Sequence, residues 1–162
     1  FEIRASLHAL VARRTLEARN PEMLAVYRAG VSRLEKLASI EDDGGRYAET
    51  TYRLTLIAAR LCGNQRLYRM LSAISLQTLR YSKLGLASKE RRQVSVALWQ
   101  KSYEALQAGD TVTYLELARA RIHASGEEAV RQIEAAPERF ANRNTAPTGQ
   151  APEGHTPKEH TP

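Results

Sequence analysis

The fold is decided by the stretch Tyr52-Arg-Leu-Thr-Leu-Ile-Ala-Ala-Arg-Leu-Cys-Gly-Asn-Gln-Arg-Leu-Tyr-Arg-Met-Leu71, in which Gly63-Asn64 interrupts an otherwise unbroken helical pattern. Glycine suits the left-handed residue that ends a helix, because it has no Cβ. Asparagine can accept a hydrogen bond from the free amides that begin the next helix. The pair therefore predicts a tight corner between two antiparallel helices.

Helical spacing of apolar residues continues outward from this corner over most of the chain. It predicts helices at about 1–19 and 21–37, a third after the loop 41–45, a fourth from the corner to about 84, a fifth at 89–108, and a sixth from 111 to before Pro137. On the first helix, Ile3, Leu7, Leu10 and Val11 form the predicted apolar face. No strand pattern competes, so we predict an all-α antiparallel bundle of about six helices.

The composition predicts one helical domain followed by a tail. A chain of 162 residues with 43% hydrophobic content can bury a continuous core. Five of the six prolines stand from Pro137 onward, in polar sequence with almost nothing to bury. We expect the domain to span residues 1–136 and residues 137–162 to form a disordered polar tail. The tail residues His155 and His160 do not make a metal site by themselves.

Charge and hydropathy narrow the class of protein. The formal net charge is +6, yet basic residues occur on every predicted helix without a dense Lys/Arg block, so we interpret them as a solvated surface. Arg91-Arg92 is interpreted in the same way, as a solvated helix start, with a domain interface as the alternative. No apolar run reaches about 18 residues and no leader is evident. We therefore predict a soluble cytoplasmic protein without a membrane-spanning helix.

Three short motifs resemble a known family of regulators. They are Arg4-Ala-Ser-Leu-His8, the Cys62-Gly-Asn64 corner, and Tyr103-Glu-Ala-Leu-Gln-Ala-Gly-Asp110. Over about residues 1–133 the chain is similar to the C-terminal, FCD-type ligand-binding domain of FadR-type transcription regulators within the GntR family. In that family the first motif commonly ends in Glu, so His8 departs from the pattern.

The resemblance implies a helical domain that dimerises and binds an effector in a pocket. Occupancy of this pocket would control an N-terminal winged helix-turn-helix. That DNA-reading module is absent from this sequence, so we expect DNA binding only through an N-terminal domain of the parent protein. The chain begins at Phe1, without Met and already in helical register. We interpret it as a piece of a longer protein.

Many relatives bind a divalent metal through an Asp and a His on the middle helix and a His on each of two later helices. Eight residues before Gly63, the first His position holds Thr55, and the Asp position one turn earlier holds Thr51. The other two His positions lie eleven residues before and eleven residues after Asp110, which ends the third motif. In this sequence they hold Trp99 and Arg121. Hydroxyls, an indole and a guanidinium cannot reproduce such a site, so we predict no metal and no other cofactor.

The four replacements suit a metal-free pocket for a small organic anion. Thr51 and Thr55 offer hydroxyls from one helix face, and Trp99 offers a flat apolar wall with one N–H donor. Arg121 supplies the positive charge that the metal supplies in relatives. The alternative is that Trp99 fills the former cavity as core and Arg121 points to solvent. The predicted ligand-binding residues are Arg4, Thr51, Tyr52, Thr55, Arg80, Trp99 and Arg121.

Other functions have less support in the sequence. Catalysis is not predicted, because the chain offers one cysteine on an apolar face, scattered histidines and no paired-carboxylate motif. A helical oligomerisation or adaptor module without a small ligand is the main alternative, since amphipathic helices explain most of the pattern. A homodimer is implied by the resemblance alone. The prediction is thus the effector-sensing and dimerisation domain of a GntR/FadR-type transcriptional regulator.

Overall fold

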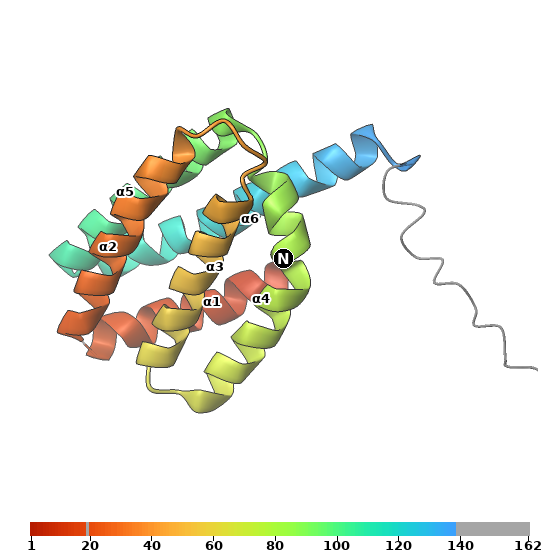
Figure 1. Cartoon of the computed structure of the whole chain (residues 1–162). Coiled ribbons are helices and arrows are strands. Elements are labelled where there is room, and N and C mark those ends of the chain that lie inside the picture. The colour runs from red at the N-terminus through yellow and green to blue at the C-terminus, as the bar shows by residue number, and fades with distance from the viewer. Residues whose placement is uncertain (19, 139–162) are drawn as a thin grey trace, which may run out of the picture.

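A computed structural model describes residues 1–18 and 20–138, which form six α-helices (Figure 1). The all-α bundle predicted from the sequence is confirmed. The predicted tail lies outside the described residues from position 139 onward, together with His155 and His160. The helices are α1 (Glu2–Ala18), α2 (Pro21–Ala38), α3 (Gly45–Leu61), α4 (Gln65–Gly85), α5 (Lys89–Ala108) and α6 (Thr111–Ala135).

The corner between α3 and α4 has the predicted conformation. Gly63 has a φ of 73°, in the left-handed region that glycine adopts without strain. Oδ1 of Asn64 accepts a hydrogen bond from the backbone N–H of Leu67 at 3.0 Å, and so caps α4. As a result α3 and α4 run antiparallel and pack side by side (Figure 1).

Side-chain caps of the same kind begin α2, α5 and α6, whereas α3 begins at Gly44 without one. Asn20 caps α2 and Pro21 occupies its first turn, where a missing N–H costs nothing. Ser88 caps α5 through a bond from the backbone N–H of Arg91 at 3.3 Å. Asp110 caps α6, accepting from the N–H of Thr113 at 3.1 Å. Short capped turns of this kind fix where each helix starts, and therefore which residues face one another across the bundle.

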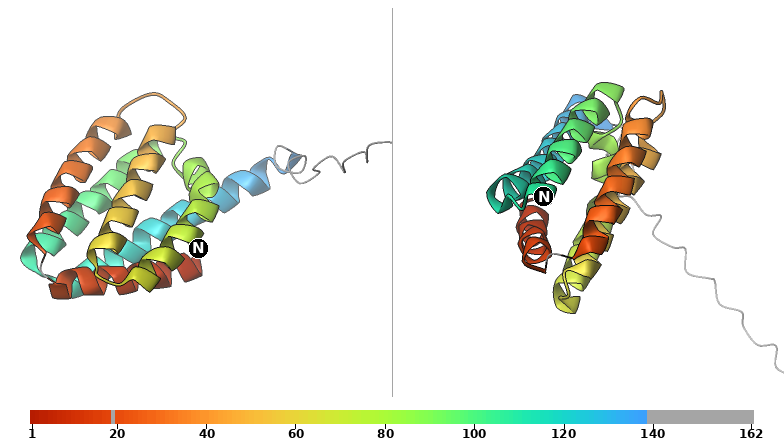
Figure 2. Two further views of the ribbon diagram at one scale, coloured as in Figure 1. Left: turned by 60° about the horizontal axis from the view of Figure 1, so that its bottom comes forward. Right: turned by 90° about the vertical axis from the view of Figure 1, so that its left-hand side faces the viewer.

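The helices form two layers around one core. The helices α2, α3 and α4 lie in one layer and α1, α5 and α6 in the other (Figure 2). Contacts link α2 to α3, α3 to α4, α4 to α6, α6 to α5 and α5 back to α2, while α1 packs against α3, α4 and α6. The helix that opens the domain is therefore in contact with both layers.

The core is built from aromatic and aliphatic side chains. Tyr27, Leu34, Leu71 and Tyr114 are almost fully buried. The hydroxyl of Tyr114 donates a hydrogen bond to the hydroxyl of Tyr27, which satisfies two polar atoms inside the core. Cys62 is buried as well, as its apolar surroundings in the sequence indicated. The core therefore needs no disulfide to hold it.

The predicted apolar face of α1 is wrong in part. Ile3 is 66% exposed and Leu10 is 41% exposed, whereas Val11 is buried as expected. The buried face of α1 instead carries Arg4 and His8, together with Ala5, Val11, Ala12 and Thr15. Apolar spacing alone misplaced this helix, because its inner face borders a polar cavity at Arg4 and His8 and reaches the core only at Val11 and Ala12.

The structure also corrects the interpretation of Arg92. Its guanidinium is fully buried and donates to the backbone oxygens of Ile40, Leu86 and Ala87, and it lies 3.6 Å from a carboxylate oxygen of Asp42. These partners belong to the loops that follow α2 and α4. Arg92 is thus a clamp between two loops and not part of a solvated helix start.

Basic residues lie on every helix, but their excess is local. The hairpin of α3 and α4, Gly45–Gly85, contains seven basic residues and one acidic residue. Its net charge of +6, seven minus one, equals the net charge of the whole chain. Five of the seven are exposed and make no ion pair with a described residue: Arg60, Arg66, Arg69, Arg80 and Lys83. None of the described helices is both long and apolar enough to cross a membrane.

Candidate functional site

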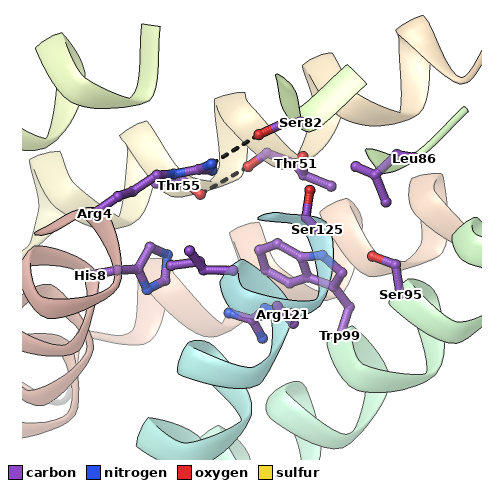
Figure 3. A pocket seen from close by; sticks show the side chains of 11 residues that line it. Arg4, His8, Thr51, Thr55, Ser82, Leu86, Ser95, Trp99, Arg121 and Ser125 are labelled. Carbon is purple, nitrogen blue, oxygen red and sulfur yellow. Dashed lines mark hydrogen bonds between the residues drawn. The ribbon is translucent and has the colours of Figure 1, made fainter. Parts of the chain in front are cut away.

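A small cavity lies among side chains of five helices, all except α2 (Figure 3). It leaves about 40 Å³ for the centres of water-sized molecules, within about 410 Å³ of unfilled space that includes its mouth to solvent. A single water needs about 10–15 Å³ by the first measure, so the cavity has room for about three waters or one compact ion. Its lining consists of Arg4, His8, Thr51, Thr55, Ser82, Leu86, Ser95, Trp99, Arg121, Ile122 and Ser125.

Five of the seven ligand-binding residues proposed from the sequence line this one cavity. Thr51 and Thr55 come from α3, Trp99 from α5, Arg121 from α6 and Arg4 from α1. They are up to 117 positions apart in the chain, and helix packing alone brings them together. The counts of eight residues from the α3–α4 corner and eleven from the α5–α6 turn therefore reach a common centre.

Arg4 presents a buried guanidinium to the cavity. Only 7% of the residue is exposed, and burial lowers its pKa to about 10, so it remains a cation at neutral pH. Its Nη1 donates to Oγ of Ser82 at 2.9 Å, which ties α1 to α4 (Figure 3). Its Nε has no hydrogen-bond partner. Among the described residues, no carboxylate forms an ion pair with it.

Arg121 is a second buried cation, and it stacks on the indole of Trp99. The guanidinium carbon lies 3.8 Å from the ring centroid, a close cation–π contact. Arg121 is 8% exposed, so it does not point to solvent as the alternative interpretation required. Nη1 donates to Oγ of Ser102, while Nη2 has no partner. Within residues 1–18 and 20–138, no ion pair with a carboxylate neutralises this charge either.

The position of Trp99 is fixed from behind by a tyrosine. The rings of Tyr27 and Trp99 are tilted by 53° with centroids 5.7 Å apart, an arrangement that aromatic pairs prefer. Trp99 is 3% exposed and forms one wall of the cavity. The indole thus takes up much of the space, as the alternative interpretation required, but it leaves a polar opening beside Arg121.

His8 lies between the two guanidiniums. Figure 3 shows its imidazole with Arg4 on one side and Arg121 on the other. The residue is 3% exposed. Burial, reinforced by the positive charges of Arg121 and Arg4, lowers the pKa of His8 to about 3. His8 is therefore a neutral imidazole at neutral pH, and its Nδ1 has no partner.

The hydroxyl groups around the cavity differ in how far they are satisfied. The hydroxyl of Thr51 donates to the backbone oxygen of Ala48 at 2.8 Å, and that of Thr55 donates to the backbone oxygen of Thr51 at 3.0 Å. Both oxygens can still accept. Oγ of Ser125 is buried and has no partner at all. Ser125 and Arg121 are one helical turn apart on α6, so their free donors belong to one face.

A divalent cation does not fit this donor set. The four positions that hold metal ligands in relatives bring together two hydroxyls already bonded to backbone, an indole and a guanidinium. A fixed positive charge at Arg121 repels a metal ion. No group of three or more His, Cys, Asp or Glu suited to a metal occurs in the described residues. The charged side chains that line the cavity, Arg4 and Arg121, are both cationic.

Two predicted residues are not brought to the cavity. Tyr52 is half-buried on α3 and is not in the lining. Arg80 is exposed and stacks on its neighbour Tyr81, with the guanidinium carbon 4.6 Å from the ring centroid. Sequence reasoning in turn missed His8 and Ser125 as site residues. Each lies four residues after a predicted arginine, so the helical repeat could have identified both.

The comparisons with known proteins agree with this structure. The family model named FCD domain matches residues 1–124, which contain every lining residue of the cavity except Ser125. No curated protein and no solved structure gives a significant match. FCD domains are the effector-binding and dimerisation domains of their regulators. The chain belongs to the FCD domain family, the C-terminal domain of GntR-family transcription regulators.

Proposed function

We propose that this chain is the effector-sensing and dimerisation domain of a FadR-type, cytoplasmic regulator. It binds a small organic acid or another anionic metabolite in the metal-free cavity. Occupancy of the cavity controls DNA binding by a winged helix-turn-helix located N-terminal to this sequence in the parent protein. The domain itself performs no catalysis, because the cavity holds neither a nucleophile paired with a base nor a metal site.

One observation carries the proposal: two buried guanidiniums face one cavity without a carboxylate beside them. Burying an unpaired charge costs several kcal/mol, on the order found when one partner of a buried ion pair is removed. Proteins tolerate such a cost at sites where a ligand supplies the missing charge. Arg4 and Arg121 are therefore anion-binding groups, and Arg121 takes over the charge that a metal provides in relatives.

The second candidate function is an oligomerisation or adaptor module without a ligand. The narrowness of the cavity favours it, since Trp99 leaves room for only about three waters. The buried charges of Arg4 and Arg121 argue against it, because neither has a carboxylate partner among the described residues and a plain core does not hold unpaired charges.

Thermal-shift screening with small organic anions separates the two functions. A ligand that binds only the folded state raises the midpoint of unfolding, by an amount set by its concentration relative to Kd. We expect an upward shift for the chain and none for Arg121→Gln. An exposed arginine that also stacks on an aromatic ring, Arg80→Gln, is the matched control and keeps the shift. No response of the chain to any anion favours the adaptor module.

Dimerisation is tested separately by sedimentation analysis at micromolar concentration. We expect a dimer whose mass does not depend on the presence of an anion. A monomer under these conditions contradicts the dimerisation part of the proposal and leaves anion binding to be decided by the thermal-shift result.

A further inference from the structure

We infer that the cavity selects a compact dianion that carries no ammonium group. This inference rests on the proposed function, because it specifies which anions the same cavity holds. Short dicarboxylates and doubly charged inorganic oxyanions share this chemistry. The number of unpaired charges, the position of the free donors and the composition of the lining all lead to it.

The charge balance of the cavity sets the ligand charge at two. Arg4 and Arg121 bring two positive charges, and His8 beside them is neutral at neutral pH. A monoanion leaves one buried positive charge without a counter-charge, and a trianion leaves one negative charge in excess. A dianion brings the site to neutrality. Since an uncompensated charge is costly where water is excluded, the doubly charged ligand is favoured.

The free donors lie on both sides of the His8 imidazole. Figure 3 draws Arg4 above the imidazole and Arg121 below it, and the two guanidiniums come from different helices, α1 and α6. Each has one fully buried nitrogen without a hydrogen-bond partner, Nε in Arg4 and Nη2 in Arg121, and Nδ1 of His8 is buried and unpartnered as well. A ligand with negative oxygens at both ends gives each guanidinium its own acceptor. Charge-assisted bonds of this kind are the stronger ones in proteins.

The lining contains no negative charge that could balance an ammonium group. Among its described residues there is no Asp and no Glu, and the only charged side chains are Arg4 and Arg121. An amino acid would place its ammonium group next to two guanidiniums, and this like-charge contact opposes binding. The cavity therefore discriminates between an acid and its amino derivative, even when both offer the same carboxylates.

The small volume limits the length of the ligand. Room for about three waters suits a compound of few heavy atoms, and a longer chain must displace Trp99 or extend through the mouth. Trp99 packs on Tyr27 from behind, so it resists displacement. We therefore place the preferred dicarboxylates among those with three or four carbons.

Isothermal titration calorimetry on the 162-residue chain tests the inference with matched probes. Malonate against propionate compares two charges with one at the same carbon count. Succinate against aspartate adds only the ammonium group. We expect malonate and succinate each to bind about tenfold tighter, or more, than their counterparts, as expected for one lost charge-assisted contact. Inorganic phosphate is a separate probe, which distinguishes an oxyanion source from a dicarboxylate source.

Variants connect the selectivity to the two guanidiniums. In Arg121→Gln and in Arg4→Gln, the preference for malonate over propionate falls to about onefold, because one counter-charge is gone. Arg80→Gln keeps the full preference. Circular dichroism checks that each variant folds. If Arg4→Gln does not fold, the inference is still tested by the malonate/propionate and succinate/aspartate comparisons on the unsubstituted chain and by Arg121→Gln.

Propionate that binds as tightly as malonate overturns the inference, and so does aspartate that binds as tightly as succinate. Either result leaves the proposed function standing, because an anion still binds. Binding of phosphate without binding of a dicarboxylate supports the dianion and assigns it an inorganic source. If neither these probes nor the wider anion panel bind, the proposed function itself fails.

Discussion

The guanidinium of Arg121 lies over the indole of Trp99, with its central carbon 3.8 Å from the ring centroid. The contact joins α5 to α6 and holds a positive charge at the edge of the cavity. A charge fixed to the chain differs from a bound metal ion, because it cannot leave when the ligand leaves. The domain therefore carries an unfavourable charge whenever the cavity holds no anion.

Replacing Arg121 by methionine is expected to leave the ligand-free chain as stable as before, or more stable by about 1 kcal/mol. The change removes an uncompensated buried charge and keeps an unbranched side chain against Trp99. Ser102 remains satisfied, because its hydroxyl donates to the backbone oxygen of Leu98 at 2.7 Å. Denaturant unfolding measures the difference, with Arg80→Met as the exposed control. A loss above about 2 kcal/mol would show that Arg121 is a structural residue.

The opposite result is expected for Arg92→Met. This guanidinium is fully buried like a core residue, but its donors meet the backbone oxygens of Ile40, Leu86 and Ala87. The substitution takes a donor from the buried backbone oxygens of Leu86 and Ala87, so we expect a loss of about 3–5 kcal/mol. The oxygen of Ile40 keeps the N–H of Asp42, and the Asp42 carboxylate keeps Gly44 and Arg46. The same denaturant series measures it. Equal effects at positions 92 and 121 would contradict the distinction between an arginine that has a carboxylate counter-charge and one that has none among the described residues.

His8 is expected to make the stability of the ligand-free chain depend on pH. Its pKa is about 3 in the folded chain and about 6.5 when unfolded, so between these values the unfolded state binds the extra proton. Stability therefore falls as the pH drops below about 6.5, by about 2 kcal/mol between pH 7 and pH 5. Thermal unfolding across this range, compared with His8→Gln, isolates the effect. Parallel profiles for the two proteins would exclude it.

Gly85→Ala tests how closely α4 approaches α6 beside the cavity. A Cβ at this position would stand 2.2 Å from the backbone oxygen of Ser125, and backbone cannot move aside as a flexible side chain can. We expect a loss of about 1–3 kcal/mol from the forced shift. Gly45→Ala is the control, since its nearest neighbour is the carboxylate end of Asp43 at 3.1 Å. Similar stabilities for both variants would mean that the helices separate at little cost.

The positions around the cavity were predictable where helices could be counted from a fixed turn. Trp99 and Arg121 are both eleven residues from Asp110, the residue that caps α6. Two helices meet at the turn that contains Asp110, and each rises about 1.5 Å per residue. Residues that are the same number of positions from the turn therefore lie at the same level of the bundle, here about 16 Å from the turn. These steps of eleven residues, and the step of eight residues from the Gly63-Asn64 corner to Thr55, came from the family resemblance, and helix geometry explains why they end at one cavity. Cap residues thus carry tertiary information when the helices between them are unbroken.

Other features had no signal of this kind. On α1 the apolar pattern favoured the face with Ile3 and Leu10, which is exposed, so it did not indicate that the opposite, polar face is buried. The partners of Arg92 are backbone oxygens, which any residue type can supply, so the sequence gives no sign of them. Arg121 lacks a counter-charge because no described acidic side chain forms an ion pair with it. The distances to the acidic residues depend on how the helices pack, which the sequence pattern does not indicate.

Trp99 is the one tryptophan of the chain. Its position against Arg121 means that the indole emission of the whole protein arises at the wall of the cavity. A guanidinium that turns towards an anion changes the electric field on that ring. The chain therefore contains its own optical reporter of the site, and excitation of tryptophan monitors occupancy without a label.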